Sequence, residues 1–542
     1  MGGASATTDI LVLPFFGQGH LFPCAELCKH LSSHNCNSIF IIPSHLSSSI
    51  PSDLPHHPSV EIVQIESSSS SPPPETTLPP DASDGDWSRP GTKPGLHHHH
   101  QLAQGIESFL SERYEKVRPA FVVMDVMMSW TKDIFKKANI PIVSFFTSGA
   151  CSAAMEYAAW KAHVENIGPD QAQKLPGLPE SMALSYSDTK RQDRRRHEHG
   201  GGRGPRGGRG PRGRGHRGGD GSRGHRGGGG DGGGDGSRGH RGGDRDGGGG
   251  RGPRESTRWM DETEGSTAVL INTCDGLEAP FLKYLTGQVE KPVFGVGPLL
   301  PETFWKSIGS VVHDRDSRLN RETNYTEDEV IQWLDSKPRH SVIYVSFGTA
   351  VGPSLEEFDQ LAEALAETDK SFIWVIKPGA GQPGPSVSIS GGRAMSESKE
   401  EGYQPHGLEE RVGNRGLIIK GWAPQLSILS HPSTGGMLSH CGWNSTVEAI
   451  ACGIPFLAWP IRGDQFYNAK LVVKYHNVGH MIAGIDDESE MVKKFDINQG
   501  INLLMDDGEV RNRAIALRGI FEGGYPSSSA ASFKTLVELI SK

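Results

Sequence analysis

The sequence predicts an α/β protein of two halves, each a parallel β-sheet covered by helices on both faces. The chain has 542 residues, which is too long for one core and suits two domains. Short apolar segments alternate with amphipathic ones through both halves, a pattern typical of βα units. A segment punctuated by Pro and Gly at 296–301 separates the two series. The fold class and a two-domain organisation therefore follow from length and patterning.

The first half opens on a short apolar run, expected to be a buried strand, followed by a Gly-containing turn and a helix. The same alternation continues through the half. A segment rich in Ser, Pro and His, 67–100, interrupts it and is predicted to be a surface loop. The expected strands are 10–15, 37–42, 60–64, 120–125, 142–146 and 268–272, and the expected helices are 21–31, 101–115 and 130–138.

The second half begins with the segment SVIYVSF at 341–347, a nearly continuous run of β-branched and aromatic residues. Such a run is typical of a strand buried on both faces of a parallel sheet. A final amphipathic segment at 527–539 predicts a terminal helix. The other expected strands are 372–376, 416–420, 436–439 and 455–458, and the other expected helices are 355–366 and 445–452.

Charge is distributed unevenly along the chain. The net charge is −9, yet segment 190–254 holds 18 Lys/Arg against 7 Asp/Glu and is rich in Gly. This segment has no aromatic or aliphatic side chain to bury, so we expect it to be disordered. The rest of the chain is acidic, which argues against a core that binds nucleic acid. RNA association through the Arg/Gly-rich segment stays open as an alternative.

Cysteine usage and the N-terminus bear on the compartment. The seven Cys are odd in number and scattered within apolar segments, so we expect buried thiols rather than disulfides. No secretory signal and no apolar run of transmembrane length is expected. We therefore predict a cytoplasmic protein without membrane insertion, and a monomer.

The segment 422–465 contains most of the residues expected to bind a ligand. It reads WAPQLSILSHPSTGGMLSHCGWNSTVEAIACGIPFLAWPIRGDQ, and its residues include the indoles of Trp422 and Trp443, the imidazole of His440, an Asn-Ser pair, a Glu and a closing Asp-Gln. A nucleotide sugar needs such a set: an aromatic face for its base, a carboxylate for its ribose, donors at a helix start for its diphosphate. The segment closely resembles the signature box of plant family-1 UDP-dependent glycosyltransferases.

The resemblance implies a GT-B architecture, in which two Rossmann-like domains face each other across a cleft. It divides this chain into an acceptor-binding domain at 1–296, a UDP-sugar-binding domain at 297–512 and a last helix within 513–542 that returns to the first domain. Segment 190–254 would be an insertion in the first domain.

The resemblance also assigns residues to each part of the donor. It implies contacts with uracil and ribose by Trp422, Ala423, Gln425 and Glu448. It implies contacts with the diphosphate by Thr349, His440, Gly442, Asn444 and Ser445. It implies contacts with the hexose by Trp443, Asp464 and Gln465, and places Thr147 near the donor.

Two of these assignments also have a physical argument. Asn444 and Ser445 stand where a helix is expected to begin, and both residue types favour the N-cap. The N–H groups of that helix start would then face the diphosphate. By resemblance, Gln465 at the last position of the box points to glucose rather than galactose as the sugar.

A second pair of residues has the character of a catalytic base and its partner. His20 follows the first strand, and Asp125 ends the expected strand FVVMD. Both would lie at the same edge of a parallel sheet, where the carboxylate can fix the tautomer of the imidazole. We expect the start of the next helix to help keep His20 neutral. GQGHLFP and FVVMDVMMSW resemble the two family motifs that hold this pair.

The resemblance implies an inverting transfer of glucose from UDP-glucose to a hydroxyl of a small aromatic acceptor, a flavonoid or other phenolic. His20 would deprotonate the hydroxyl, and an α-linked donor would give a β-glucoside. No metal and no other cofactor is expected. Asp314 and Asp316 have the spacing of metal-dependent glycosyltransferases, but they stand in a polar segment. Transfer to carbon, giving C-glycosides, is not excluded.

Overall fold

A computed structural model describes most of the chain. The described residues are 8–66, 93–114, 118–164, 167–188, 258–313, 323–348, 352–381, 402–483 and 491–540. The expectations for segment 190–254, for Thr349 and for the pair Asp314 and Asp316 lie outside these residues.

The first domain is built on a seven-stranded parallel sheet with the order β3-β2-β1-β4-β5-β8-β9. Its first six strands have the Rossmann order. The strands are β1 (Thr8–Leu13), β2 (Cys36–Pro43), β3 (Val60–Ile65), β4 (Phe121–Asp125), β5 (Ile142–Phe146), β8 (Ala268–Ile271) and β9 (Val293–Gly295). The helices are α1 (Gln18–Ser32), α2 (Lys93–Arg113), α3 (Lys132–Lys137), α4 (Ala150–Lys161), α6 (Arg258–Thr263) and α7 (Asp275–Thr286). A two-stranded ribbon, β6 (Ala172–Gln173) and β7 (Leu184–Ser185), stands apart.

The second domain repeats the arrangement on a six-stranded parallel sheet with the order β12-β11-β10-β13-β14-β15. The strands are β10 (Val342–Ser346), β11 (Ser371–Ile376), β12 (Gly416–Lys420), β13 (Thr434–Ser439), β14 (Phe456–Ala458) and β15 (Gly479–Met481). The helices are α8 (Glu302–Lys306), α9 (Glu327–Asp335), α10 (Leu355–Glu367), α11 (Leu408–Val412), α12 (Gln425–Ser430), α13 (Trp443–Cys452), α14 (Gln465–Lys470), α15 (Lys494–Asp506) and α16 (Gly508–Arg518). The predicted α/β class with two Rossmann-like domains is confirmed.

The central strands of both sheets are buried because their sequences are apolar on both sides. Every residue of β10 is buried, and so is every residue of β4, including its closing Asp125. Helices α9 and α10 instead begin with capping boxes, in which Thr326 and Ser354 accept from the backbone of a Glu three residues on. These local signals explain why the alternation of strands and helices could be predicted.

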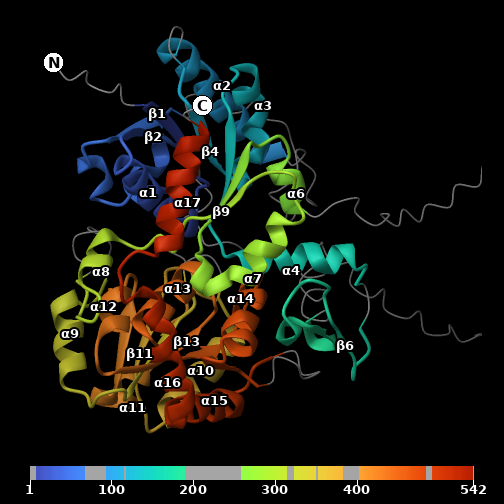
Figure 1. Cartoon of the computed structure of the whole chain (residues 1–542). Helices are drawn as coiled ribbons and strands as arrows, with labels where there is room; N and C mark the ends of the chain where they lie inside the picture. Colours follow the sequence, from blue (N-terminus) through green and yellow to red (C-terminus); the bar gives the residue numbers. More distant parts are fainter. Residues whose placement is uncertain are drawn as a thin grey trace, which may run out of the picture.

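The last helix, α17 (Ser527–Ile540), leaves the second domain and packs on the first (Figure 1). Phe533 and Leu536 are buried in the same cluster as residues of β1 and α1. Tyr525, just before the helix, donates its hydroxyl to the carbonyl of Val296 at 2.7 Å. The chain end is thereby tied to the linker between the domains.

The domains also share a core. One cluster of buried side chains includes Cys151 and Leu277 of the first domain with Trp443 and Val447 of the second. The two domains are therefore joined by apolar packing.

One sequence-based expectation about an element is wrong, and two expected helices have other bounds. Helix α2 starts at Lys93, so the His residues at 97–100 are in a helix and not in a loop. The helix expected at 130–138 is a 3₁₀ turn, Val126–Thr131, followed by the short α3. Helix α13 starts at Trp443 rather than at 445. The error at 97–100 arose because the loop predicted from a high content of Ser, Pro and His was continued to residue 100, past the start of α2 at Lys93.

Candidate functional site

Both domains place polar residues at the point where the strand order of a Rossmann-like sheet reverses. In the first sheet β1 lies beside β4, and in the second β10 lies beside β13. Ligands of such sheets bind beyond the carboxyl ends of these central strands. His20 follows β1, Asp125 ends β4, and His440 follows β13. The two halves of the predicted site are thus built at equivalent positions.

The predicted catalytic pair is in contact. Nδ1 of His20 lies 2.7 Å from Oδ2 of Asp125, although the residues are 105 positions apart. Asp125 is fully buried, and its other oxygen accepts from the backbone N–H of Met127 at 2.9 Å. The carboxylate is therefore fixed on both oxygens. It holds Nδ1 of the imidazole and leaves Nε2 to act as the base.

The electrostatics of His20 differ from the expectation. His20 is the third residue of α1, and we expected the helix start to keep it neutral. Burial lowers the pKa of His20, but the charge and hydrogen bond of Asp125, with the charge of Asp464, outweigh it and raise the pKa above 6.5. Asp125 was expected beside His20, but its effect on the pKa was not weighed against the helix start, and the charge of Asp464 was not foreseen.

Thr147 also lies beside His20, the predicted catalytic base. Its hydroxyl oxygen is 2.9 Å from Nδ1 of His20, and its side chain is buried at the end of β5. The sequence placed this residue near the donor, and the structure adds a contact with the imidazole. Asn272 donates to the carbonyl of Thr147 at 3.2 Å and so holds the turn in which it stands.

The predicted diphosphate site is the start of α13. Gly442 is the N-cap, and no side chain caps the helix. The expectation that Asn444 and Ser445 cap it is therefore wrong, because the helix begins one residue before them. An N-terminal turn without a side-chain cap presents its N–H groups to a ligand, which is what a diphosphate requires.

His440 stands beside this helix start. Its side chain is 8% exposed, and burial lowers its pKa to about 4, so it is neutral at physiological pH. Nδ1 is buried without a hydrogen-bond partner among the described residues. A Cβ on Gly348 or Gly442 would come within 2.6 Å or 2.5 Å of Nε2, so both positions need glycine. A neutral imidazole in this place can donate one hydrogen bond to a phosphate oxygen.

The predicted ribose contacts form one network. Nε2 of Gln425 donates to Glu448 at 2.5 Å and to the hydroxyl of Ser445 at 3.1 Å, and Tyr344 donates to Oε1 of Gln425 at 3.0 Å. Glu448 is 2% exposed. A carboxylate oriented this way suits a pair of ribose hydroxyls.

Trp422 precedes this network and is half-buried. The ammonium of Lys377 lies 4.2 Å from the centroid of its ring. Ala423 is buried next to it, so it can offer only backbone groups to a base. The half-buried indole is suited to stacking on a planar ring.

The residues predicted to contact the hexose have different surroundings. Asp464 accepts from Ser148 at 2.6 Å and from Asn468 at 3.1 Å. Oε1 of Gln465 accepts from the backbone N–H groups of 461 and 462 at 2.8 Å and 2.9 Å. The indole of Trp443 is buried and donates to the carbonyl of Asn272 at 2.7 Å. Trp443 therefore holds the domains together with its ring, and only its backbone is placed to contact a donor.

Asn444 joins the two halves of the site. Its amide donates to the carbonyl of Gly19 at 3.3 Å, across the cleft. Gly19 is the residue before His20, so the base stands next to the helix start that is suited to a diphosphate. An acceptor and a donor bound at the two halves would meet here.

Sequence reasoning missed three residues of the interface. Ser148 directly follows Thr147, and its position after a parallel strand was a usable signal. Asn272 likewise follows β8. Glu278 gave no signal: it is fully buried in a distorted turn of α7 and accepts from the N–H groups of Ala150 and Cys151 at 2.8 Å and 2.7 Å. Burial raises its pKa to about 7.

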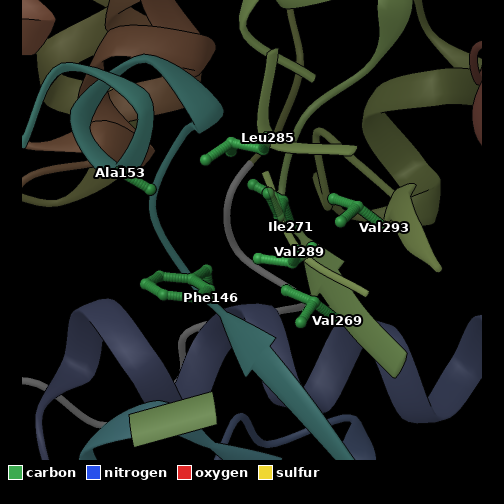
Figure 2. Close-up of a pocket in the computed structure, with 7 residues that line it drawn as sticks. All are labelled: Phe146, Ala153, Val269, Ile271, Leu285, Val289 and Val293. Carbon is green, nitrogen blue, oxygen red and sulfur yellow. The ribbon is translucent and has the colours of Figure 1, made fainter. Parts of the chain in front are cut away.

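The apolar cavity in Figure 2 is not part of this site. It lies between α4, α7 and the strands β5, β8 and β9, and has about 10 Å³ of free volume. That is room for one water at most, and every residue of its lining is apolar. A sugar or a phenolic ring does not fit, so the cavity is a packing defect of the first domain.

Within the described ranges, His, Cys, Asp and Glu form no group of three that could hold a metal ion. In the same ranges no helix has the length and apolarity needed to span a bilayer.

The fold and the site define a two-domain Rossmann-like protein of the GT-B architecture. The family model described as UDP-glucoronosyl and UDP-glucosyl transferase matches residues 319–522. Over these residues the chain is similar to UDP-glycosyltransferases, and the relatives that it resembles include plant enzymes.

Two named plant relatives show the extent of this similarity. UDP-glycosyltransferase 73C3 of Arabidopsis thaliana is 38% identical over 256 residues, which are 47% of this chain and 46% of the relative. The chain thus spans about half the length of this relative. UDP-glucose flavonoid 3-O-glucosyltransferase 7 of Fragaria ananassa is 25% identical over 93% of this chain and 86% of its own. The fold resembles that of Medicago truncatula UGT71G1 complexed with UDP-glucose, with a TM-score of 0.64, 20% identity and full coverage of both chains.

Proposed function

We propose that this chain is an inverting glycosyltransferase that moves glucose from UDP-glucose to a hydroxyl of a small aromatic acceptor. One observation carries the proposal: the hydrogen bond between Asn444 and Gly19 joins the start of α13 to the residue before His20. It brings a base and a diphosphate site to one point of the cleft. Neither half alone supports a transfer reaction.

The proposed step is a direct displacement. Nε2 of His20 takes the proton of the acceptor hydroxyl, and the acceptor oxygen forms a bond to the anomeric carbon on the face opposite UDP. The bond from that carbon to the phosphate oxygen breaks, so an α-linked donor gives a β-glucoside. Asp125, 2.7 Å from Nδ1, stabilises the imidazolium that results.

The leaving group gains negative charge as this bond breaks. The N–H groups at the start of α13 and the neutral His440 stand where they can stabilise it. Fixed donors of this kind need no reorganisation during the reaction. In this proposal no metal is required, because the helix start and the imidazole supply the stabilisation.

An aromatic acceptor is supported by the surroundings of the base. The ring of Phe15 meets the imidazole of His20 edge-on, with centroids 5.2 Å apart, and Phe16 stacks on Phe15. Both side chains are half-buried. Aromatic side chains beside a base suit a planar phenol. The flavonoid acceptor in the name of the Fragaria relative is of the same chemical kind.

The test is transfer itself. The protein is incubated with UDP-glucose and a panel of phenols, and products are identified by mass spectrometry, with acid hydrolysis to separate O-glucosides from acid-stable C-glucosides. His20→Ala should lower turnover by roughly 10²- to 10⁴-fold, the usual contribution of a general base, with UDP affinity unchanged. Near-normal turnover in this variant would remove His20 from the mechanism.

The sugar is tested separately with Gln465→His. By the family pattern this change should shift preference from UDP-glucose toward UDP-galactose. An unchanged preference would mean that Gln465 does not select the sugar. UDP affinity serves as the control, since UDP carries no hexose.

A further inference from the structure

Three consecutive residues at the end of β5 face three different parts of the site. Thr147 contacts His20, as described above. Ser148 donates its hydroxyl across the cleft to Oδ2 of Asp464 at 2.6 Å. Gly149 lies against the indole of Trp443, where a Cβ would come within 2.6 Å of the ring. One short turn of the first domain therefore touches the base and two elements of the second domain.

The bond between Ser148 and Asp464 is short and charge-assisted, since a hydroxyl donates to a carboxylate. Oδ2 of Asp464 also accepts from Asn468 at 3.1 Å. Two donors on the same oxygen fix the plane of the carboxylate. In the proposed function, Oδ1 is then left to accept from a hydroxyl of the sugar.

Two side chains of the first domain fix the turn that contains Ser148. Asn272 donates to the carbonyl of Thr147, and Glu278 accepts from the first two N–H groups of α4. Glu278 and Asn272 are both buried. The backbone on either side of Ser148 is therefore fixed by buried side chains of its own domain.

We infer that Ser148 is a positioning residue for the donor sugar: it orients Asp464 from the opposite domain, so the hexose site is complete only when the domains are in contact. This inference rests on the proposed function, in which Asp464 contacts the hexose. It separates the binding of UDP-glucose from the binding of UDP, which the contacts within segment 422–465 alone do not. Losing the Ser148 hydroxyl should weaken the binding of UDP-glucose but not of UDP, which has no sugar to contact Asp464.

The experiment compares the wild type with Ser148→Ala, Ser148→Thr and Ser152→Ala. Ser152 is the matched control, because its hydroxyl bonds to the carbonyl of Gly149 at 3.1 Å within the same turn and domain. The Kd of UDP is measured by calorimetry, the KM of UDP-glucose and kcat by product formation, and folding by the melting temperature.

We expect Ser148→Ala to raise the KM of UDP-glucose by about 10-fold or more, as for loss of a hydrogen bond to a charged group. Its Kd for UDP should stay within about twofold of the wild-type value. This is much less than the tenfold change in Kd that corresponds to 1.4 kcal/mol. Ser148→Thr keeps a hydroxyl and should restore most of the affinity. In Asp464→Ala, the added change at Ser148 should have no further effect, because the two act as one unit.

Three results would overturn the inference alone: an unchanged KM in Ser148→Ala, a parallel loss of UDP affinity, or an equal effect in Ser152→Ala. The last would show a general loosening of the turn. A wild-type protein that neither binds UDP nor transfers from UDP-glucose would instead overturn the proposed function and this inference with it.

Discussion

The carboxylate of Asp125 meets Nδ1 of His20 at 2.7 Å from the end of the neighbouring strand, while Asp464 of the other domain adds a second negative charge nearby. The pKa of His20 is therefore set by both domains together. An imidazole with a raised pKa is protonated, and unable to act as a base, over a wider range of acid pH.

The first prediction concerns this pH dependence. The acidic limb of kcat/KM should lie above pH 6.5, because the pKa of His20 is raised. Asp125→Asn removes the charge that raises it, so the limb should move to lower pH, while the maximal rate falls because the imidazolium is no longer stabilised. Rate profiles from pH 5 to 9 measure both. A limb that stays in place in the variant would show that another group titrates.

The second prediction concerns the nucleoside. Trp422→Ala and Glu448→Ala should each raise the KM of UDP-glucose and the Kd of UDP by about 10-fold or more, equivalent to at least ~1.4 kcal/mol. The first loses the half-buried ring and the second the carboxylate held by Gln425 at 2.5 Å. Calorimetry with UDP alone measures the effect, and Trp422→Phe should recover part of it. Unchanged UDP affinity in both Ala variants would place the nucleoside elsewhere.

The fold and much of the candidate site could be predicted because their signals are local in the sequence. The strand β10 is apolar throughout, and the box from Trp422 to Gln465 keeps its polar residues at fixed spacing. The approach of His20 to Asp125 followed from parallel strands ending at one edge. What failed depended on neighbours that the sequence does not reveal, such as Asp464 of the other domain, which adds to the effect of Asp125 in raising the pKa of His20. Ser148 and Trp443 contact residues of the other domain, and no pattern within one domain names these partners.

The third prediction concerns Asn272, whose side chain donates to the carbonyl of Thr147 and accepts from the N–H of Leu299 at 2.8 Å. Asn272→Ala leaves both backbone groups buried without a partner, at about 1–3 kcal/mol each. We expect a clear fall in melting temperature. Asn37→Ala is the control, because Asn37 is half-buried and makes one bond, to Asp9 at 3.0 Å. Equal losses in the two variants would show that burial of Asn272 adds nothing.

The last prediction concerns acid stability. Burial lowers the pKa values of His30, His440 and His476 to about 4, whereas an unfolded His titrates near 6.5. As the pH falls from 6.5 to 4, the unfolded chain binds protons that the native chain does not. Unfolding is then favoured by at most about 3 kcal/mol for each residue.

His30 isolates one of these contributions, because its ring stacks on Tyr525 and Phe533 with centroids 4.2 Å and 5.5 Å away. His30→Phe keeps an aromatic ring in the stack between α1 and α17 but binds no proton. Melting temperatures of the variant should therefore fall less steeply than those of the wild type between pH 6.5 and 4.5, and the two curves should be parallel above pH 7. A constant difference at every pH would mean that His30 contributes packing only, and that its protonation is not linked to unfolding.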